Sequence, residues 1–260
     1  MIWTFLRQLF RSPERQATLF GRTDTGRTRP NNEDSFFIQP RARLMMVADG
    51  MGGHNAGEVA SRVAIETMAS LLDPAHLARA GANQVEVCHH LIHALRLSNE
   101  RVMAMADENE TYAGMGCTLI AGFITHNRLY TCHVGDVRAY LLHQDGIRQI
   151  TSDHTLVAEY TKAHKDDADF DPSALHMNRN IVSRAIGFPF PEDPECTVTP
   201  MAPGDRILLC SDGLWSMVPD TELALSLKES ATPEEACDRL ILAANEAGGK
   251  DNITAVVAFA

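Results

Sequence analysis

Leu44-Met45-Met46-Val47-Ala48-Asp49-Gly50-Met51-Gly52-Gly53-His54 carries the clearest structural signal in the chain. Residues 44–48 are a short continuous apolar run, which is typical of a buried strand. The run ends at Asp49 and Gly50, where a carboxylate stands beside a residue that permits a sharp turn. The stretch therefore predicts a buried strand that delivers a carboxylate at its end.

Three other segments place a carboxylate beside a small or turn-forming residue: Arg29-Pro30-Asn31-Asn32-Glu33-Asp34, Ser211-Asp212-Gly213 and Lys250-Asp251-Asn252. Glu33, Asp49, Asp212 and Asp251 can share a site only if the fold gathers positions that are far apart in the chain. Such a cluster repels itself unless cations hold it together. The combination predicts a hydrolytic centre with two metal ions.

The remaining pattern alternates apolar strands with helices. Helical spacing of apolar residues predicts helices over 58–72 and 84–106, and a third helix begins at the capping sequence Thr232-Pro233-Glu234-Glu235 and stops at Gly248-Gly249. Further strands are predicted at 206–210 and 253–259, and a meander over 117–142 with turns at His126-Asn127 and Gly135-Asp136. This order favours a mixed α+β fold in which helices cover sheets.

Composition excludes several classes of protein. The chain has 260 residues, 45% of them hydrophobic and 22% charged, which is typical of one globular domain and not of a disordered chain. The formal net charge of -11 argues against a nucleic-acid partner. The six cysteines form no Cys-x-x-Cys pair, and the sequence shows no membrane span and no signal peptide, so we expect reduced thiols and a cytoplasmic location.

Two segments stand apart from this core pattern. Residues 1–20 place apolar side chains among Arg7, Arg11 and Arg15, and we interpret them as an amphipathic N-terminal extension, either a helix packed on the domain or a weak contact with a membrane or partner. Residues 21–260 are then a single domain. Its polar stretch from Thr161 to Asn180 predicts a flap, which we bound at about residues 153–187.

The carboxylate segments belong to a longer series of motifs that occur in one order: Arg29-x3-Glu33-Asp34, Val47-Ala48-Asp49-Gly50-Met51-Gly52-Gly53, Gly116-Cys117-Thr118, Val134-Gly135-Asp136-x-Arg138, Asp153-His154, Ser183-Arg184-Ala185-Ile186-Gly187, Ser211-Asp212-Gly213-Leu214-Trp215 and Lys250-Asp251-Asn252-Ile253-Thr254. In this order the chain resembles the metal-dependent serine/threonine phosphatases of the PP2C (PPM) family, bacterial type, over about residues 21 to 260. The resemblance implies a central antiparallel β-sandwich of two sheets flanked by helices on both sides.

The resemblance also implies a mechanism and a set of metal ligands. A metal-bound water that bridges two Mn²⁺ or Mg²⁺ ions is expected to hydrolyse phosphoserine and phosphothreonine, because oxygen ligands suit these hard ions. Asp49 would bridge the ions, about 4 Å apart. Asp212 and Asp251 would complete one ion, Glu33 the other, and the Gly50 carbonyl would add a neutral ligand. Asp136 either joins Asp212 in holding a third ion or is only a hairpin turn.

Three further residues receive catalytic roles by resemblance. Arg29 would bind the substrate phosphate through its planar fork. Asp34 would orient metal-bound water, unless it is a turn aspartate. Many eukaryotic members carry a histidine directly after the Asp-Gly pair, where this chain has Met51, so His54 either supplies the general acid in its place or is a loop histidine without that role.

Other functions stay open at this point. The same centre could cleave small phosphate esters, and a noncatalytic phosphatase-like binding module is a third reading, although such a module would normally have lost a metal ligand. We expect a monomer that acts on phosphorylated proteins and reverses a bacterial serine/threonine kinase.

Overall fold

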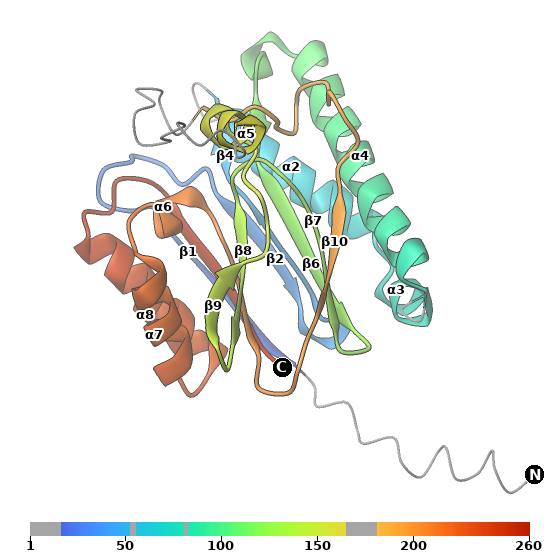
Figure 1. Cartoon of the computed structure of the whole chain (residues 1–260). Coiled ribbons are helices and arrows are strands. Elements are labelled where there is room, and N and C mark those ends of the chain that lie inside the picture. The colour runs from blue at the N-terminus through green and yellow to red at the C-terminus, as the bar shows by residue number, and fades with distance from the viewer. Residues whose placement is uncertain (1–16, 53–55, 81–82, 165–180) are drawn as a thin grey trace, which may run out of the picture.

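The computed structural model describes residues 17–52, 56–80, 83–164 and 181–260. Two five-stranded antiparallel sheets form its centre, and helices cover the outer face of each (Figure 1). In spatial order, the first sheet contains β1 (Thr18–Asp24), β12 (Ile253–Phe259), β11 (Arg206–Cys210), β8 (Arg138–His143) and β9 (Gly146–Gln149). The second contains β10 (Cys196–Pro200), β7 (Arg128–Val134), β6 (Leu119–Thr125), β3 (Leu44–Ala48) and β2 (Ser35–Gln39). The predicted sandwich of two antiparallel sheets between helices is confirmed.

The helices divide between the two outer faces. The second sheet packs against α2 (Ala56–Leu71), α3 (Pro74–Ala80) and α4 (Gln84–Glu108), and the first sheet against α7 (Asp220–Glu229) and α8 (Pro233–Glu246). The segments that connect these strands and helices contain short elements: β4 (Gly50–Met51), β5 (Gly116–Cys117), α5 (Leu156–Ala163), α6 (Asp212–Trp215), and 3₁₀ turns at Pro40–Ala42 and Glu110–Tyr112.

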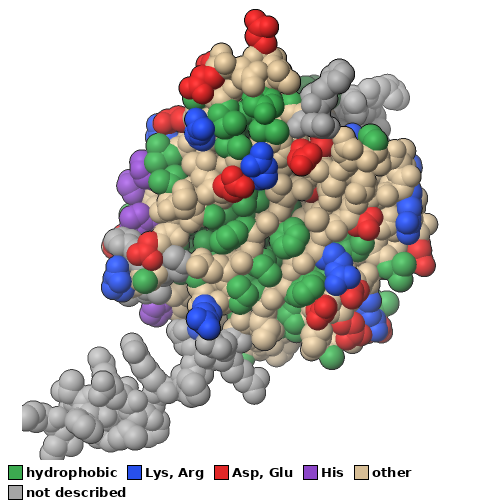
Figure 2. All heavy atoms as spheres, turned by 180° about the vertical axis from the view of Figure 1, so that it is seen from behind, with side chains coloured by type: hydrophobic (Ala, Val, Ile, Leu, Met, Phe, Trp, Pro, Cys, Tyr) green, Lys and Arg blue, Asp and Glu red, His purple; other side chains and the backbone are tan. Residues whose placement is uncertain are grey.

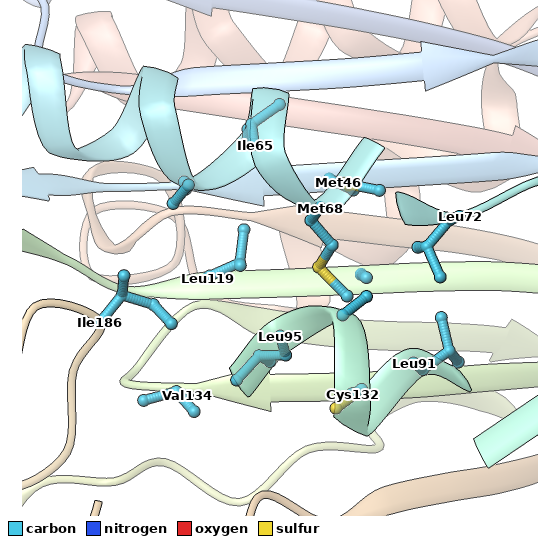
Figure 3. Close-up of a cluster of buried hydrophobic side chains, with 14 of the residues drawn as sticks. Met46, Ile65, Met68, Leu72, Leu91, Leu95, Leu119, Cys132, Val134 and Ile186 are labelled. Atoms are coloured by element: carbon cyan, nitrogen blue, oxygen red, sulfur yellow. The ribbon is translucent and has the colours of Figure 1, made fainter. Parts of the chain in front are cut away.

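Three hydrophobic cores hold the four layers together. In β3, Met46 faces the helices while Met45 and Val47 face the opposite sheet, so both faces of the strand are buried. This explains why β3 reads as an uninterrupted apolar run. Figure 3 shows the core on the helix side, where Met68 of α2 and Leu91 of α4 meet Cys132 of β7.

The start of α8 follows the predicted capping chemistry. At the start of α8, the Thr232 hydroxyl accepts a hydrogen bond from the Glu235 N–H at 3.1 Å, and the Glu235 carboxylate accepts one from the Ala231 N–H at 2.8 Å. The turn at His126-Asn127 is also confirmed, because both residues adopt positive φ, 48° and 55°, between the paired strands β6 and β7.

Two sequence expectations need correction. The meander was wrong at Gly135-Asp136, because β7 and β8 belong to different sheets and this dipeptide carries the chain from one to the other. The N-terminal extension was predicted to end at residue 20, whereas β1 begins at Thr18 and pairs Thr18 with Phe259. The rest of that extension, residues 1–16, and flap residues 165–180 lie outside the described residues.

All six cysteines are free thiols. Basic and acidic side chains are interspersed on the face seen from behind (Figure 2). Within the described ranges, no helix has the length and apolar character needed to cross a membrane.

Candidate active site

A cavity of about 270 Å³ opens at the end of the sandwich where β3, β7 and β11 stop and β2, β8 and β12 start. Its lining comes from segments far apart in the sequence: Arg29, Glu33, Asp49, Gly50, Met51, Gly52, Thr118, Asp136, Val182, Asp212, Asp251 and Asn252. All six residues predicted to face metal ions are in this lining, together with Arg29. The antiparallel topology brings these loops to one end, which is why carboxylates from both ends of the chain meet.

Asp49 is fixed by its backbone as it leaves β3. Its carbonyl accepts a hydrogen bond from the Thr118 N–H at 2.8 Å, and its N–H donates to the Thr118 hydroxyl at 3.3 Å. The next residue must be glycine, because a Cβ on Gly50 would lie 2.2 Å from the Gly57 carbonyl oxygen and 2.5 Å from that of Glu33. The close approach brings the first turn of α2 and the Glu33 loop against the backbone of Gly50, directly after Asp49.

Asp212 begins the short helix α6 and lies against Asp49. Both carboxyl groups line the cavity, and Asp49 is among the neighbours that influence the pKa of Asp212. The Oδ1 atom of Asp212 is buried and has no protein hydrogen-bond partner among the described residues. A carboxylate oxygen in that condition is costly unless another group binds it.

Electrostatics in the cavity disfavour negative charge. Burial first, and then the neighbouring carboxylates, raise the pKa of Asp49 well above its ordinary value. The same two causes raise the pKa of Asp212 and bring that of Asp136 to about 7. Burial also raises the pKa of Glu33, against the opposing effect of Arg29. A cation in the cavity would relieve both the desolvation and the mutual repulsion.

These observations test whether the residues fit divalent metal ions. The potential metal ligands are all oxygen atoms, and several of the carboxyl groups have raised pKa values. Among the described residues, the buried Asp212 Oδ1 atom has no hydrogen-bond partner. These properties suit hard cations. No group of three or more His, Cys, Asp or Glu side chains in the described part of the chain is already arranged to hold a metal ion. Mg²⁺ and Mn²⁺ commonly keep several water ligands and do not need an all-protein cage. The residues therefore fit partly hydrated ions.

Arg29 and Asp251 form an ion pair at the cavity edge. The Arg29 Nη2 atom donates to Asp251 Oδ2 at 2.7 Å, and the arginine side chain is about half exposed. The negative charges of Asp251, Asp49 and Asp212 all act to raise the pKa of this guanidinium, against the opposing effect of burial. An incoming phosphate would thus meet one exposed guanidinium at the rim of an acidic site.

Asp34 lies behind the cavity and does not line it. Its Oδ2 atom accepts hydrogen bonds from the hydroxyls of Ser211 at 2.7 Å and Thr254 at 2.6 Å, and its Oδ1 atom is buried without a hydrogen-bond partner among the described residues. Burial raises the pKa of Asp34 to about 7. Asp34 thus connects the start of β2 to the residue before Asp212 and to β12.

Asp136 sits on the crossing between the two sheets. Its carbonyl oxygen accepts a hydrogen bond from the Trp215 indole N–H at 2.9 Å, and the preceding Gly135 N–H donates to the His154 ring at 3.2 Å. Asp136 is only 4% exposed. The crossing therefore aims this carboxylate at the cavity and is not the hairpin turn that the sequence left open.

His54 lies outside the described residues, and the neighbouring Met51 and Gly52 line the cavity. Sequence reasoning did not assign functional positions to Thr118, Val182 or Asn252, which also line it. Thr118 and Asn252 stand inside quoted motifs, which is the signal that could have drawn attention to them. Val182 carries no such signal.

Comparisons with known proteins give consistent results. Residues 10–253 match the family Protein phosphatase 2C. A "Serine/threonine phosphatase stp" of Listeria innocua is 37% identical over 242 residues, which are 91% of this chain and 93% of that protein. Two solved structures of the serine/threonine phosphatase PstP are also similar, the first of them from Mycobacterium tuberculosis. One is 37% identical with a TM-score of 0.80 and covers 94% of this chain and 98% of its own. The other, described as the catalytic domain in complex with 2 manganese ions, is 36% identical with a TM-score of 0.77 and covers 94% of this chain and 97% of its own.

Proposed function

This chain belongs to the protein phosphatase 2C family and is a serine/threonine phosphatase, and we propose that it hydrolyses phosphoserine and phosphothreonine on proteins with the help of two divalent cations. The observation that carries the proposal is the convergence of five carboxylates, from segments between residues 33 and 251, on one cavity. Mn²⁺ or Mg²⁺ is the cation that we propose, because the donors are all oxygens. The PstP structure with manganese supports this choice.

The five carboxylates and the Gly50 carbonyl receive roles as cation ligands in this proposal. Asp49, Asp212 and Asp251 would hold one cation, and Asp49, Glu33 and the Gly50 carbonyl would hold a second. Asp136 with Asp212 would offer a weaker third position. When bound, the cations supply charge neutralisation, an activated water and in-line positioning for attack on phosphorus.

The protein's own groups bind and orient the substrate. The Arg29 guanidinium exchanges its carboxylate partner for two phosphate oxygens of the substrate, for which a planar fork is well suited. Asp34, through its bonds to Ser211 and Thr254, keeps the segment before Asp212 in place. We assign to His54 the proton that the departing serine or threonine alkoxide needs.

The proposed substrate class rests on the relatives. The named relatives are serine/threonine phosphatases, so we propose phosphorylated cytoplasmic proteins as substrates and a bacterial serine/threonine kinase as the opposing enzyme. Phosphate release from a phosphothreonine peptide, compared with release from small phosphate esters, separates this proposal from a small-ester phosphatase. A higher kcat/KM for small esters than for the peptide would contradict it.

The cation requirement is tested by removing and returning the metal. A chelator should abolish activity, and Mn²⁺ or Mg²⁺ should restore it. Asp212→Asn should reduce kcat by orders of magnitude, because it weakens both cation binding and water activation. Full activity in EDTA, or in the Asp212→Asn variant, would overturn the two-cation proposal.

A further inference from the structure

Asn252 contacts three backbone groups of the loop that carries Arg29 and Glu33. Its Oδ1 atom accepts a hydrogen bond from the Glu33 N–H at 2.8 Å. Its Nδ2 atom donates to the carbonyl oxygens of Thr25 at 3.0 Å and Asn31 at 2.8 Å. One side chain near the end of the chain therefore holds two carbonyls and one N–H of a loop near the start.

The partners fix the orientation of the amide. Two carbonyl oxygens can only be met by the NH₂ group, and a backbone N–H can only be met by the amide oxygen. Asn252 is 5% exposed, so water cannot easily replace these bonds. An aspartate of the same shape could keep the bond to Glu33 but would face two carbonyl oxygens with no donor.

Glu33 is held from its other side by the Asp49-Gly50 loop. Its carbonyl oxygen accepts hydrogen bonds from the Gly50 N–H at 3.1 Å and from the Ser61 hydroxyl at 2.6 Å. The Glu33 backbone is thus fixed between Asn252 and Gly50. Removing the Asn252 amide leaves the Glu33 backbone held only through its carbonyl oxygen, by Gly50 and Ser61.

The two loops are packed together at other points as well. The Arg27 N–H donates to the Gly249 carbonyl at 2.7 Å, and a Cβ on Gly26 would lie 2.2 Å from the Asp251 carbonyl oxygen. Gly26 has φ +80°, a conformation that favours glycine. The loop is therefore built to lie directly against the residues around Asp251.

We propose that Asn252 is a positioning residue that sets the Arg29 and Glu33 side chains relative to Asp251 through its three backbone hydrogen bonds. The inference deepens the proposed function and rests on it for the roles of Arg29 and Glu33. Asn252 acts through the loop, because its side-chain hydrogen bonds all go to backbone groups of Thr25, Asn31 and Glu33.

The test compares Asn252→Ala and Asn252→Asp with Asn245→Ala. Asn245 is a matched control, because it is a buried amide near the same loop, donates to Asp24 Oδ1 at 3.1 Å, and does not line the cavity. In both Asn252 variants, the affinity for Mn²⁺ alone, measured by calorimetry, should fall by about 10- to 100-fold, as for other groups that orient metal ligands. KM for a phosphothreonine peptide at saturating Mn²⁺ should rise, and Asn245→Ala should match the wild type in both measurements.

Amide exchange of the wild-type protein tests the proposal without metal or substrate. The Glu33 N–H should exchange slowly although it lies in a loop, and in Asn252→Ala it should exchange about tenfold faster or more. Exchange of the wild-type Glu33 N–H at the rate of an open loop would overturn the proposal, and this measurement decides the matter if a variant fails to fold. Wild-type Mn²⁺ affinity and KM in a folded Asn252→Ala protein, or equal losses in Asn245→Ala, would also overturn it. A wild type without any response to Mn²⁺ would instead refute the proposed function and leave the exchange test valid.

Discussion

Arg138→Ala should destabilise the protein by about 3 to 5 kcal/mol, the range for removing one partner of a buried ion pair. The Arg138 fork contacts Asp153 with distances of 3.0, 3.2 and 2.7 Å, and the two side chains are only 18% and 13% exposed. Among the described residues, alanine would leave the buried Asp153 carboxylate with only the hydrogen bond from the Gln149 amide, at 2.8 Å. The guanidinium also lies 3.4 Å from the centre of the Trp215 ring, a cation–π contact that adds about 0.5 to 2 kcal/mol.

Urea unfolding of the metal-free protein measures this loss, and a thermal scan should show Tm lower by about 6 to 20 °C. Arg62→Ala is the control, because Arg62 and Glu66 form an exposed pair at 3.6 Å that should contribute less than about 0.5 kcal/mol. Adding Asp153→Asn to Arg138→Ala should recover part of the loss, because the unpaired buried charge is gone. A loss below about 1 kcal/mol for Arg138→Ala, or no recovery in the double variant, would refute the reasoning.

Three further predictions concern Arg29, His54 and His154. Arg29→Ala should raise KM for a phosphopeptide by about 10- to 100-fold, because a hydrogen bond to a charged group contributes about that much to binding. The affinity for Mn²⁺, measured by calorimetry, should stay nearly constant. A collapse of metal binding with unchanged KM would contradict the assigned role. His54→Ala should slow hydrolysis of a phosphothreonine peptide by about 10²-fold but barely affect p-nitrophenyl phosphate, whose leaving group needs no proton; equal losses on both would indicate a structural role. Burial, followed by repulsion from His133, lowers the pKa of His154 to about 4, so the stability that its neutral ring provides is complete above about pH 6.5 and is lost as the pH falls toward 4. The Tm difference between wild type and His154→Gln should therefore shrink between pH 7 and pH 4.5, and a constant difference would contradict the prediction.

The buried strands could be predicted from sequence because burial on both faces leaves a continuous apolar signal. Predicted bounds for β3, β11 and β12 agree with the structure. β10 was missed because it is an edge strand, Cys196–Pro200, in which only Thr199 is buried. β1 was missed because its half-buried residues show no clear alternation. Local pattern reports burial, and strands with little burial leave little pattern.

The crossing at Gly135-Asp136 shows a different limit. A glycine and an aspartate between two apolar runs give the same local signal in a hairpin and in a connection between sheets. Long-range pairing decides between them, since β7 pairs with β6 and β10 while β8 pairs with β11 and β9. This pairing also changes the meaning of Asp136, from a possible turn residue to a buried carboxylate that lines the cavity.

The candidate site was more accessible to sequence reasoning than its supports. Carboxylates in unusual contexts, such as Asp49 after a buried strand, draw attention because their local setting is costly. Asn252 and Thr118 act through hydrogen bonds to backbone groups of distant residues. Such bonds depend on the tertiary fold and leave no periodicity in the sequence.

The arrangement of the acidic cavity also explains why this fold needs so many fixed backbone contacts around it. Burial and like charge raise the pKa values of Asp34 and Asp136 to about 7, so in the absence of cations the carboxylates tend to separate or to take up protons. Hydrogen bonds to uncharged backbone groups oppose that tendency. Thr118 and Trp215 donate to the carbonyl oxygens of Asp49 and Asp136, and Asn252 accepts from the Glu33 N–H. Because these contacts do not depend on whether a carboxyl group is charged, they can keep the oxygens converging before any cation binds. Repulsion among the carboxylates therefore destabilises the cavity locally, and burial of apolar side chains in the three hydrophobic cores offsets that cost.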